Sequence, residues 1–310
     1  MSKLVVQESG KFQWSDFPNL KSAEDLENYM KYKKSNKDNE KYANLRAYYH
    51  EGFYHYTKLE TIEKILEGNN FLLFHPGDSN DPAEKTIQEK EYKFYLCFST
   101  GINENLPLWY LYSGMDGKGG QLSFTKSLIY DLLHKGKYSL VERKGADSKT
   151  ILADREEILL SEDDFECTLQ DVLYFGKTDQ KIDLKYNTMT NHNQISCTEF
   201  EKFQNNNQEF VKSLIWYYEK ETRLLVKLTE KGTRHLKDGK FYAIKLSFGH
   251  LENVRKKMKL VLAPEVETME GYIKNEDYPH IYKFLFDTSN VKLSKHKGEV
   301  KMNLCKNCTR

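Results

Sequence analysis

Phe53-Tyr54-His55-Tyr56-Thr57 begins the most clearly patterned stretch of this 310-residue chain, and its aromatic residues predict a short β-strand. A helix is predicted next, ending at Gly68, because apolar residues recur there at the spacing of one helical face. Those apolar residues are Leu59, Ile62, Ile65 and Leu66. Phe71-Leu72-Leu73-Phe74 then predicts a second strand. The patterned part of the chain therefore begins with the order strand, helix, strand.

The rest of the chain predicts further short strands, separated by irregular segments. They are expected at residues 94–99, 121–124, 172–175, 223–226, 241–246 and 261–263, with a short helix or turn at 106–112. We expect the strand at 241–246 to pair with the strand at 223–226. Strands mixed with a few helices favour an α+β fold, and 310 residues suffice for one large domain with appendages.

Changes in composition divide the chain into three regions. They are an N-terminal helical appendage at 1–45, a main domain at 46–290 and a basic, flexible tail at 291–310. Within the main domain, residues 179–209 are rich in Asn, Gln and Lys, and they predict a surface insertion leading into a helix that ends near Trp216. Cys305 and Cys308 in the tail supply at most half of a zinc site, so we expect no metal.

The overall composition excludes several classes of protein. With 39% hydrophobic residues, 30% charged residues and a net charge of +1, the chain is expected to be soluble and without an overall basic charge. No apolar run approaches the roughly 18 residues of a membrane span. The N-terminus also lacks the apolar core of a secretory signal. Five cysteines, an odd number and mostly isolated, favour a reducing compartment. We therefore expect a cytoplasmic protein with no membrane partner.

His55 and Thr57 are the first candidate binding residues. Alternate side chains of a strand point to one face, so these two share a face and Tyr56 points to the other. An imidazole and a hydroxyl on one face can hydrogen-bond a ribose or a carboxamide. The alternative is a core histidine bonded to the backbone. Asn80 and Asp81 fit a structured turn that caps the next helix.

Trp109 and Tyr112 form a second candidate group. They are three residues apart, so in a helix both rings lie on one face, where they can sandwich a flat heterocycle. Gly114 and the glycines of 117–120 follow, and glycine lets a ligand approach the backbone closely. Packing in the core explains the same aromatic pattern, and the residue types leave both interpretations open.

Glu219, Glu221 and Arg223 form the third candidate group. In an extended segment all three side chains point to one face, with the two carboxylates about 7 Å apart. A fixed carboxylate stabilises the positive charge that develops on a ribose when its glycosidic bond breaks. A second carboxylate can deprotonate or orient a nucleophile, and an arginine can pair with a carboxylate or a phosphate. The alternative is an exposed strand edge with alternating charges.

Taken in order, these motifs resemble the ADP-ribosyltransferase superfamily. That pattern is a His-x-Thr strand at 54–57, an aromatic segment at 108–114 and a late Glu-x-Glu at 219–221. Together with Asn80-Asp81-Pro82-x-Glu84 and Cys97-Phe98-Ser99, they also resemble a prokaryotic domain family of unknown function over residues 53–226. The resemblance implies an α+β fold with an ADP-ribosyltransferase-like split β-sheet core and flanking helices. It further implies that NAD binds in the cleft between the two halves of the sheet.

The resemblance also implies roles for the candidate residues. The residues expected to contact the co-substrate NAD are His55, Tyr56, Thr57, Asn80, Asp81, Trp109, Tyr112 and Arg223. Among them, His55 holds the ribose, and Trp109 and Tyr112 flank the nicotinamide. Glu221 is then the catalytic carboxylate and Glu219 orients the acceptor.

The function implied is that of an NAD-dependent ADP-ribosyltransferase, acting as a bacterial toxin or anti-phage effector that an antitoxin can accompany. The alternatives are an NAD glycohydrolase, with water as the acceptor, and a non-catalytic nucleotide- or nucleic-acid-binding module. RNA or DNA is slightly favoured over protein as the acceptor, because the pocket motif also resembles RNA-repair enzymes that open with a His-x-Thr strand. The basic cluster at 255–259 and the basic tail could follow a phosphate backbone, although a solvated surface explains them as well.

Overall fold

The computed structural model combines helices and β-sheets in the α+β class that the sequence predicts. It describes residues 50–78, 92–101, 104–112, 118–145, 150–152, 156–178, 181–185, 193–264, 273–288 and 291–294. The expected appendage at 1–45 lies outside these ranges, as do Cys305 and Cys308. Among the described helices, none is both long and apolar enough to cross a membrane.

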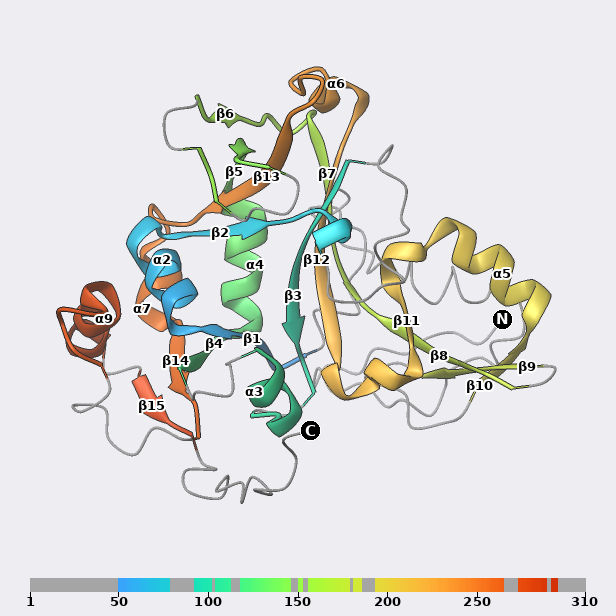
Figure 1. Ribbon diagram of the computed structural model, residues 1–310, viewed down its shortest axis with the longest axis horizontal. Coiled ribbons are helices and arrows are strands. Elements are labelled where there is room, and N and C mark those ends of the chain that lie inside the picture. The colour runs from blue at the N-terminus through green and yellow to red at the C-terminus, as the bar shows by residue number, and fades with distance from the viewer. Residues whose placement is uncertain are drawn as a thin grey trace, which may run out of the picture.

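Seven strands form the central sheet, in the order β15-β14-β4-β1-β3-β12-β7 (Figure 1). Their bounds are β1 (Gly52–Lys58), β3 (Lys93–Ser99), β4 (Gly119–Thr125), β7 (Phe165–Asp171), β12 (Glu221–Leu228), β14 (Lys259–Leu262) and β15 (Val291–Leu293). β14 and β15 are parallel, and the other neighbouring pairs are antiparallel. The tail expected from residue 291 therefore begins with a strand of this sheet.

A second sheet has the order β2-β13-β5-β6. Its strands are β2 (Asn70–Leu73), β5 (Lys137–Arg143), β6 (Ile158–Leu159) and β13 (Phe241–Ser247). The expected pairing of 241–246 with 223–226 is wrong, because β13 pairs with β2 and β5, whereas β12 pairs with β3 and β7. Both strands are rich in apolar residues, so their patterns alone do not say which neighbour each one takes.

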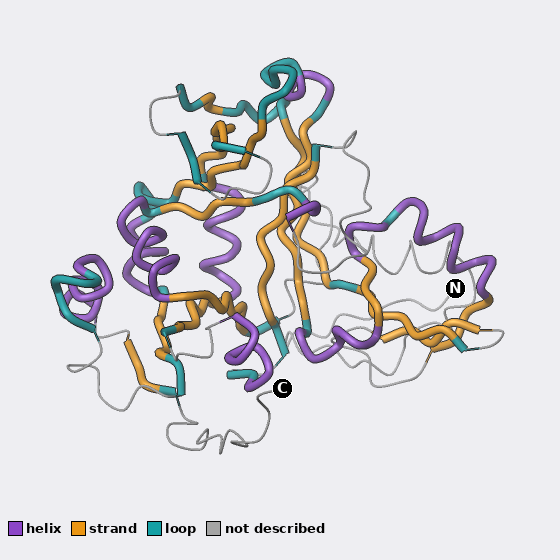
Figure 2. The backbone as a smooth tube through the Cα atoms, in the orientation of Figure 1, coloured by secondary structure: helices purple, strands orange, loops and turns teal. Residues whose placement is uncertain are grey.

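A third sheet, with the order β10-β9-β8-β11, forms a lobe with the helix α5 at the right of Figure 1. We call residues 173–213 the lobe. Its elements are β8 (Leu173–Lys177), β9 (Lys181–Lys185), β10 (Asn193–Ser196), α5 (Cys197–Asn206), the 3-10 helix η6 (Gln208–Phe210) and β11 (Val211–Ser213). Figure 2 shows α5 lying beside these strands and apart from the other helices.

The lobe has a hydrophobic core of its own, which packs on the central sheet. That core includes Leu173, Ile182, Leu184, Ile195, Phe200, Phe203, Phe210 and Val211. Tyr95 of β3 and Leu225 of β12 belong to the same cluster. Because these two side chains come from the central sheet, the region predicted as a surface insertion is joined to the sheet by buried apolar contacts.

The remaining helices lie outside the lobe. They are α2 (Leu59–Gly68), α3 (Leu106–Tyr112), α4 (Lys126–Lys135), α6 (Glu230–Thr233), α7 (Glu252–Lys257), α9 (Pro279–Thr288) and the 3-10 helices η4 (Pro76–Asp78) and η7 (Leu214–Glu219). The predicted helix at 59–68 is confirmed, and its four apolar residues are buried. Its left-handed cap is Asn69, with φ of 47°, rather than Gly68. Asn tolerates this conformation better than most residues do.

β1 and β3 separate along most of their length, and this separation positions the site. Their register contains one pair, Tyr54 with Ser99. Farther along β3, the backbone of Tyr95 exchanges two hydrogen bonds with Phe74, which follows β2. β3 is therefore held by β1 at one end and by the chain after β2 at the other, and a space opens between these contacts.

We predict that Phe203→Ala lowers the free energy of unfolding by about 3–5 kcal/mol, because it empties a fully buried ring position in the lobe. Urea unfolding of the two proteins measures this difference. Asn205→Ala, at an exposed position of the same helix, is the matched control and should change stability by less than about 0.5 kcal/mol. Equal effects of the two substitutions would contradict a separate packed core in the lobe.

Candidate active site

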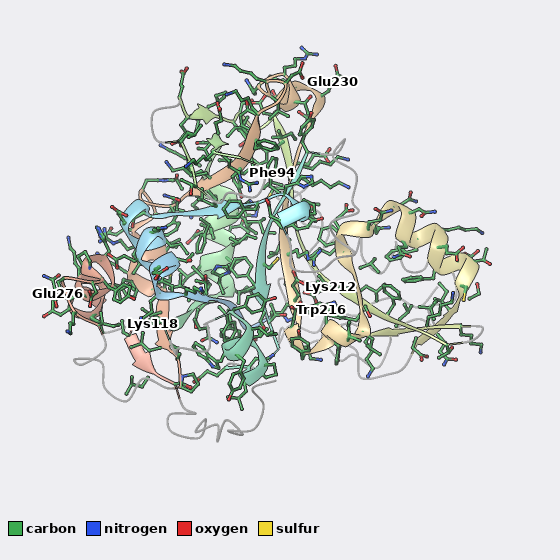
Figure 3. The ribbon with its side chains drawn as sticks, in the orientation of Figure 1. Phe94, Lys118, Lys212, Trp216, Glu230 and Glu276 are labelled. Atoms are coloured by element: carbon green, nitrogen blue, oxygen red, sulfur yellow. The ribbon has the colours of Figure 1, made fainter. Side chains whose placement is uncertain are left out.

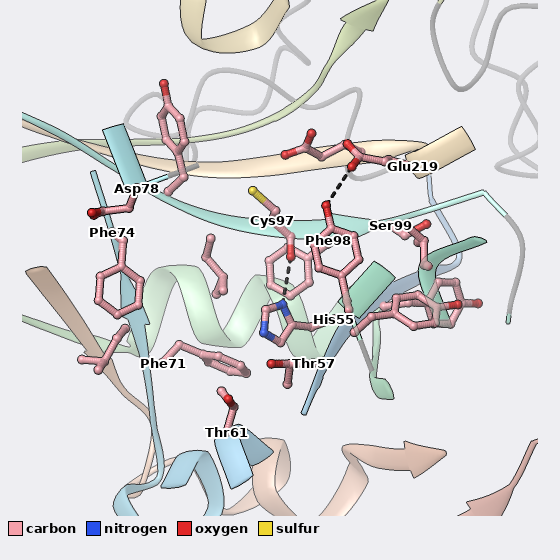
Figure 4. A pocket seen from close by; sticks show the side chains of 18 of the residues that line it. His55, Thr57, Thr61, Phe71, Phe74, Asp78, Cys97, Phe98, Ser99 and Glu219 are labelled. Atoms are coloured by element: carbon pink, nitrogen blue, oxygen red, sulfur yellow. Dashed lines mark hydrogen bonds between the residues drawn. The ribbon is translucent and has the colours of Figure 1, made fainter. Parts of the chain in front are cut away.

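A pocket of about 440 Å³ lies where β1 and β3 separate. One part of its lining comes from β1, α2 and β2, and includes His55, Thr57 and Thr61. The other comes from β3, α3, β11, η7 and β12, and includes Glu219 and Glu221. In Figure 4, Cys97 lies in the middle of the view. His55 and the two threonines lie on one side of it, and Glu219 lies on the other side.

His55 spans the gap between β1 and β3. Its Nδ1 donates a hydrogen bond to the carbonyl oxygen of Cys97 at 3.0 Å, because a carbonyl can only accept. Burial lowers the pKa of His55, although the bond to Cys97 works against that shift. The imidazole is therefore neutral at neutral pH, with a proton on Nδ1 and a lone pair on Nε2. Nε2 is thus suited to accept a hydrogen bond from a ligand hydroxyl or amide.

The faces of β1 follow the predicted alternation. His55 and Thr57 are half-buried and both line the pocket. Tyr56 also contributes to the lining, but it is buried, and its hydroxyl accepts hydrogen bonds from the Asn105 backbone N–H and the Gln121 amide, each at 2.7 Å. The Tyr56 ring therefore anchors β1 to the core. The alternative expected from the sequence was a histidine that is hydrogen-bonded to the backbone. Nδ1 of His55 does form such a bond, whereas Nε2 can accept a hydrogen bond from a ligand.

Glu221 is buried and held by two cations. Arg223 binds it in a bidentate manner, with Nε 2.7 Å from Oε1 and Nη2 3.0 Å from Oε2. Lys212 Nζ lies 3.0 Å from the same Oε2. Burial by itself would raise the pKa of Glu221, but Arg223 and Lys212 outweigh it and hold that pKa well below its usual range. Glu221 is therefore a permanent anion at neutral pH.

Glu219 has a different electrostatic environment. The Tyr112 hydroxyl donates to its Oε1 at 2.8 Å, and Lys212 Nζ lies 2.6 Å from its Oε2. Burial and the charge of Glu221 raise the pKa of Glu219, despite the opposing effect of Lys212. Two neighbouring carboxylates thus have pKa values that are displaced in opposite directions, which is the usual arrangement for an acid–base pair.

The backbone between the two acids differs from the extended segment that the sequence predicts. Glu219 ends η7, Glu221 begins β12, and Lys220 between them is left-handed, with φ of 47°. This turn, rather than strand alternation, lets both carboxylates reach one lysine. Lys220 itself points elsewhere, with its ammonium 3.1 Å from the centroid of the Tyr217 ring.

The two aromatic residues expected to flank a ligand lie in different places. Trp109 is 2% exposed, packs edge-on against Tyr56 at 5.0 Å between centroids, and is not among the residues that line the pocket. Tyr112 does line the pocket, and so does Trp216, whose ring centroid lies 5.2 Å from Nζ of Lys212. The spacing of residues 109 and 112 could not show that one side chain lies in the core and the other in the pocket. Residues three apart in a helix differ in direction by about 60°, which is enough to place them in different surroundings.

Arg223 binds Glu221 but is not among the residues that line the pocket. It is 1% exposed, and its Nη1 donates to the backbone oxygen of Glu209 at 2.6 Å. The structure therefore pairs it with a carboxylate. Asn80 and Asp81 lie outside the described residues.

Residues beyond the predicted set also line this pocket, among them Cys97, Ser99 and Lys212. Cys97 and Ser99 belong to a motif that was given no role, yet both line the pocket, and Ser99 is in register with Glu221. Desolvation and the charge of Glu221 raise the pKa of the Cys97 thiol, so it is uncharged beside the carboxylate. Lys212 was also missed, although a single charge within the apolar segment 210–214 is a signal that could have found it.

Comparison with known proteins found no matching family model and no matching curated protein. Two solved structures of DarT from Thermus sp. 2.9 are similar to this chain, one in complex with NAD+ and one in complex with carba-NAD+. The first has 10% sequence identity and a TM-score of 0.30, and the second has 9% and 0.28. Each match covers 79% of this chain and 95% of the DarT chain. Both TM-scores are low.

We predict that Arg223→Met lowers the free energy of unfolding by about 3–5 kcal/mol, because it removes the bidentate partner of a buried carboxylate. In a Glu221→Gln background the same substitution should cost less, since the charge that Arg223 neutralises is gone. Urea unfolding of the four proteins gives this coupling. Arg255→Met, at an exposed position, serves as the control. An equal cost of Arg223→Met in both backgrounds would contradict the pairing.

Proposed function

We propose that the chain is an NAD-dependent ADP-ribosyltransferase, which transfers ADP-ribose from NAD to a macromolecule. One observation carries the proposal: a neutral histidine and a hydroxyl face a permanently ionised glutamate and a second glutamate of raised pKa within one pocket. The separation of β1 from β3 supports the split-sheet core that the motif resemblance implies. A volume of about 440 Å³ is in the range of small-molecule sites.

In the proposed reaction the bond between the nicotinamide nitrogen and C1′ of the ribose breaks, and nicotinamide leaves with the bonding electron pair. Positive charge then develops on the ribose. Glu221 faces this charge as an anion, and it needs no proton transfer to become one. A fixed charge in a site sheltered from water stabilises a transition state more than a mobile charge in water does.

Glu219 is proposed to act on the acceptor. The acceptor nucleophile attacks C1′ and must lose a proton as the new bond forms. A carboxylate of raised pKa is a better base than an ordinary one, and Glu219 lies beside Glu221 through their shared lysine. In the glycohydrolase alternative, water takes the place of the macromolecular acceptor and Glu219 has the same role.

His55 and Thr57 are proposed to hold the ribose of NAD, with Nε2 of His55 accepting from a ribose hydroxyl. Tyr112 and Trp216 are proposed as the aromatic sides of the nicotinamide subsite, because both line the pocket. Trp109, in the core, has a structural role in this proposal. Nucleic acid remains the favoured acceptor class.

We predict that Glu221→Gln lowers the rate of nicotinamide release from NAD by about 10²-fold or more, because an amide cannot supply the negative charge. Glu67→Gln, at an exposed position, is the matched control and should leave the rate unchanged. With labelled NAD and cell extract, label in nuclease-sensitive or protease-sensitive material identifies the acceptor. Nicotinamide release without transfer favours the glycohydrolase, and its absence in the unmodified protein favours a binding module.

The aromatic subsite is tested by tryptophan fluorescence. NAD should quench the fluorescence of the unmodified protein, and Trp216→Phe should remove most of that quenching because Trp216 lines the pocket. Trp109→Phe should leave the quenching intact, since Trp109 is in the core. Titration of each variant with NAD measures both effects. Quenching that is lost in Trp109→Phe and kept in Trp216→Phe would reverse the assignment.

A further inference from the structure

The lobe supplies two groups to Glu221 through one pair of residues. β11 and β8 are parallel, and Lys212 is in register with Tyr174. The backbone N–H of Glu221 donates to the Tyr174 hydroxyl at 2.8 Å, and Lys212 Nζ lies 3.0 Å from Glu221 Oε2. Lys212 and Tyr174 are both buried. The lobe thus contributes directly to the candidate active site, and its contribution includes a charge.

Lys212 is the cation that the two carboxylates share. Its Nζ lies 2.6 Å from Glu219 and 3.0 Å from Glu221, and 5.2 Å from the centroid of the Trp216 ring. Figure 3 shows Lys212 and Trp216 together between the central sheet and the lobe. Arg223, the other cation, donates hydrogen bonds to Glu221 and to the backbone oxygen of Glu209. Among the described contacts, Lys212 is therefore the cation that neutralises Glu219.

Two buried carboxylates cannot both stay ionised at close range without a cation between them. With Lys212 and Arg223 present, two negative charges meet two positive charges. Without Lys212, Arg223 would still hold Glu221 as an anion. The negative charge of Glu221 would then repel a negative charge on Glu219. Glu219 would therefore take up a proton and lose its ability to act as a base.

We propose that Lys212 is a positioning residue of this centre, which holds Glu219 in its ionised form beside Glu221 and so prepares it to receive a proton from the acceptor. The catalytic consequence rests on the proposed function. The effect of the Lys212 charge on the ionisation of Glu219 does not depend on the proposed function, and it can be measured in the protein without NAD.

The direction of the pH effect follows from the groups that face Glu219. They are Tyr112 of α3, Lys212 of β11, Glu221 of β12 and Tyr218 of its own element η7. Burial and the charge of Glu221 raise the pKa of Glu219, whereas Lys212 and the Tyr112 hydroxyl lower it. Removing the lysine charge must therefore raise this pKa further. A reaction that needs ionised Glu219 then loses rate at neutral pH and regains it at alkaline pH.

We predict that Lys212→Met raises the titration midpoint of the Glu219 carboxyl by about one pH unit or more, because a lost ion pair at this distance is worth at least that shift. The measurement is the ¹³C chemical shift of the glutamate carboxyls between pH 4 and 9 in the protein without NAD, with the Glu219 signal assigned by its loss in Glu219→Gln. Lys212→Gln, which keeps a hydrogen-bond donor without the charge, should give the same shift. Lys212→Arg should restore the original midpoint.

The rate of nicotinamide release gives the second readout. Its acid limb should move to higher pH in Lys212→Met by the same amount as the carboxyl midpoint, giving about a tenfold loss of rate below that limb. An unmoved midpoint in both Lys212→Met and Lys212→Gln overturns the proposal, and so does a faster reaction in Lys212→Met, which would make the lysine an inhibitory cation. If the midpoint moves and the unmodified protein releases no nicotinamide, the charge relation stands and the proposed function fails.

Discussion

A buried cluster of two acids and two bases is the constraint on which the rest of this structure depends. Glu219, Glu221, Lys212 and Arg223 are each no more than 7% exposed. Removing such charges from water costs several kcal/mol for each ion, and only close pairing offsets that cost. The pairing in turn requires β11 of the lobe, the end of η7 and the start of β12 to meet at one point. The lobe therefore cannot shift on the central sheet without exposing a charge pair or leaving it unpaired.

The turn between the two acids is held from behind by a polar network. Lys220 adopts a left-handed conformation, which costs about 1–2 kcal/mol for a residue with a Cβ. Its carbonyl oxygen accepts hydrogen bonds from the backbone N–H and the hydroxyl of Thr100, at 2.9 and 3.1 Å. The same hydroxyl is 3.1 Å from that of Thr222, which donates to Asp171. Lys220 is thus held in its left-handed conformation by Thr100, which is linked to Thr222 on the face of β12 opposite Glu221.

Local pattern predicted much of the fold and part of the site. The helix at 59–68 and the strand at 94–99 were predicted, and 106–112 was predicted as a short helix or turn, because these patterns depend only on nearby residues. The shared face of His55 and Thr57 follows from strand alternation in the same way.

Features set by distant contacts could not be predicted in this way. The partners of β13 and the burial of Trp109 depend on which elements meet in space. The left-handed Lys220 gave no sequence signal, because Lys is not a residue that favours that conformation. Lys212 is seven residues from Glu219, and only the register of β11 with β8 brings it to both acids.

The asymmetry of the site follows from where each cation comes from. Arg223 is on the same strand as Glu221, two residues away, so this pair forms wherever β12 forms. Lys212 arrives with the lobe, and it reaches the acid that lies at the end of η7 as well as the acid on β12. The charge of Glu221 is therefore fixed by the central sheet, whereas the charge of Glu219 depends on docking of the lobe. A change that loosens the lobe would therefore alter the ionisation of Glu219 first, because Glu221 remains paired with Arg223.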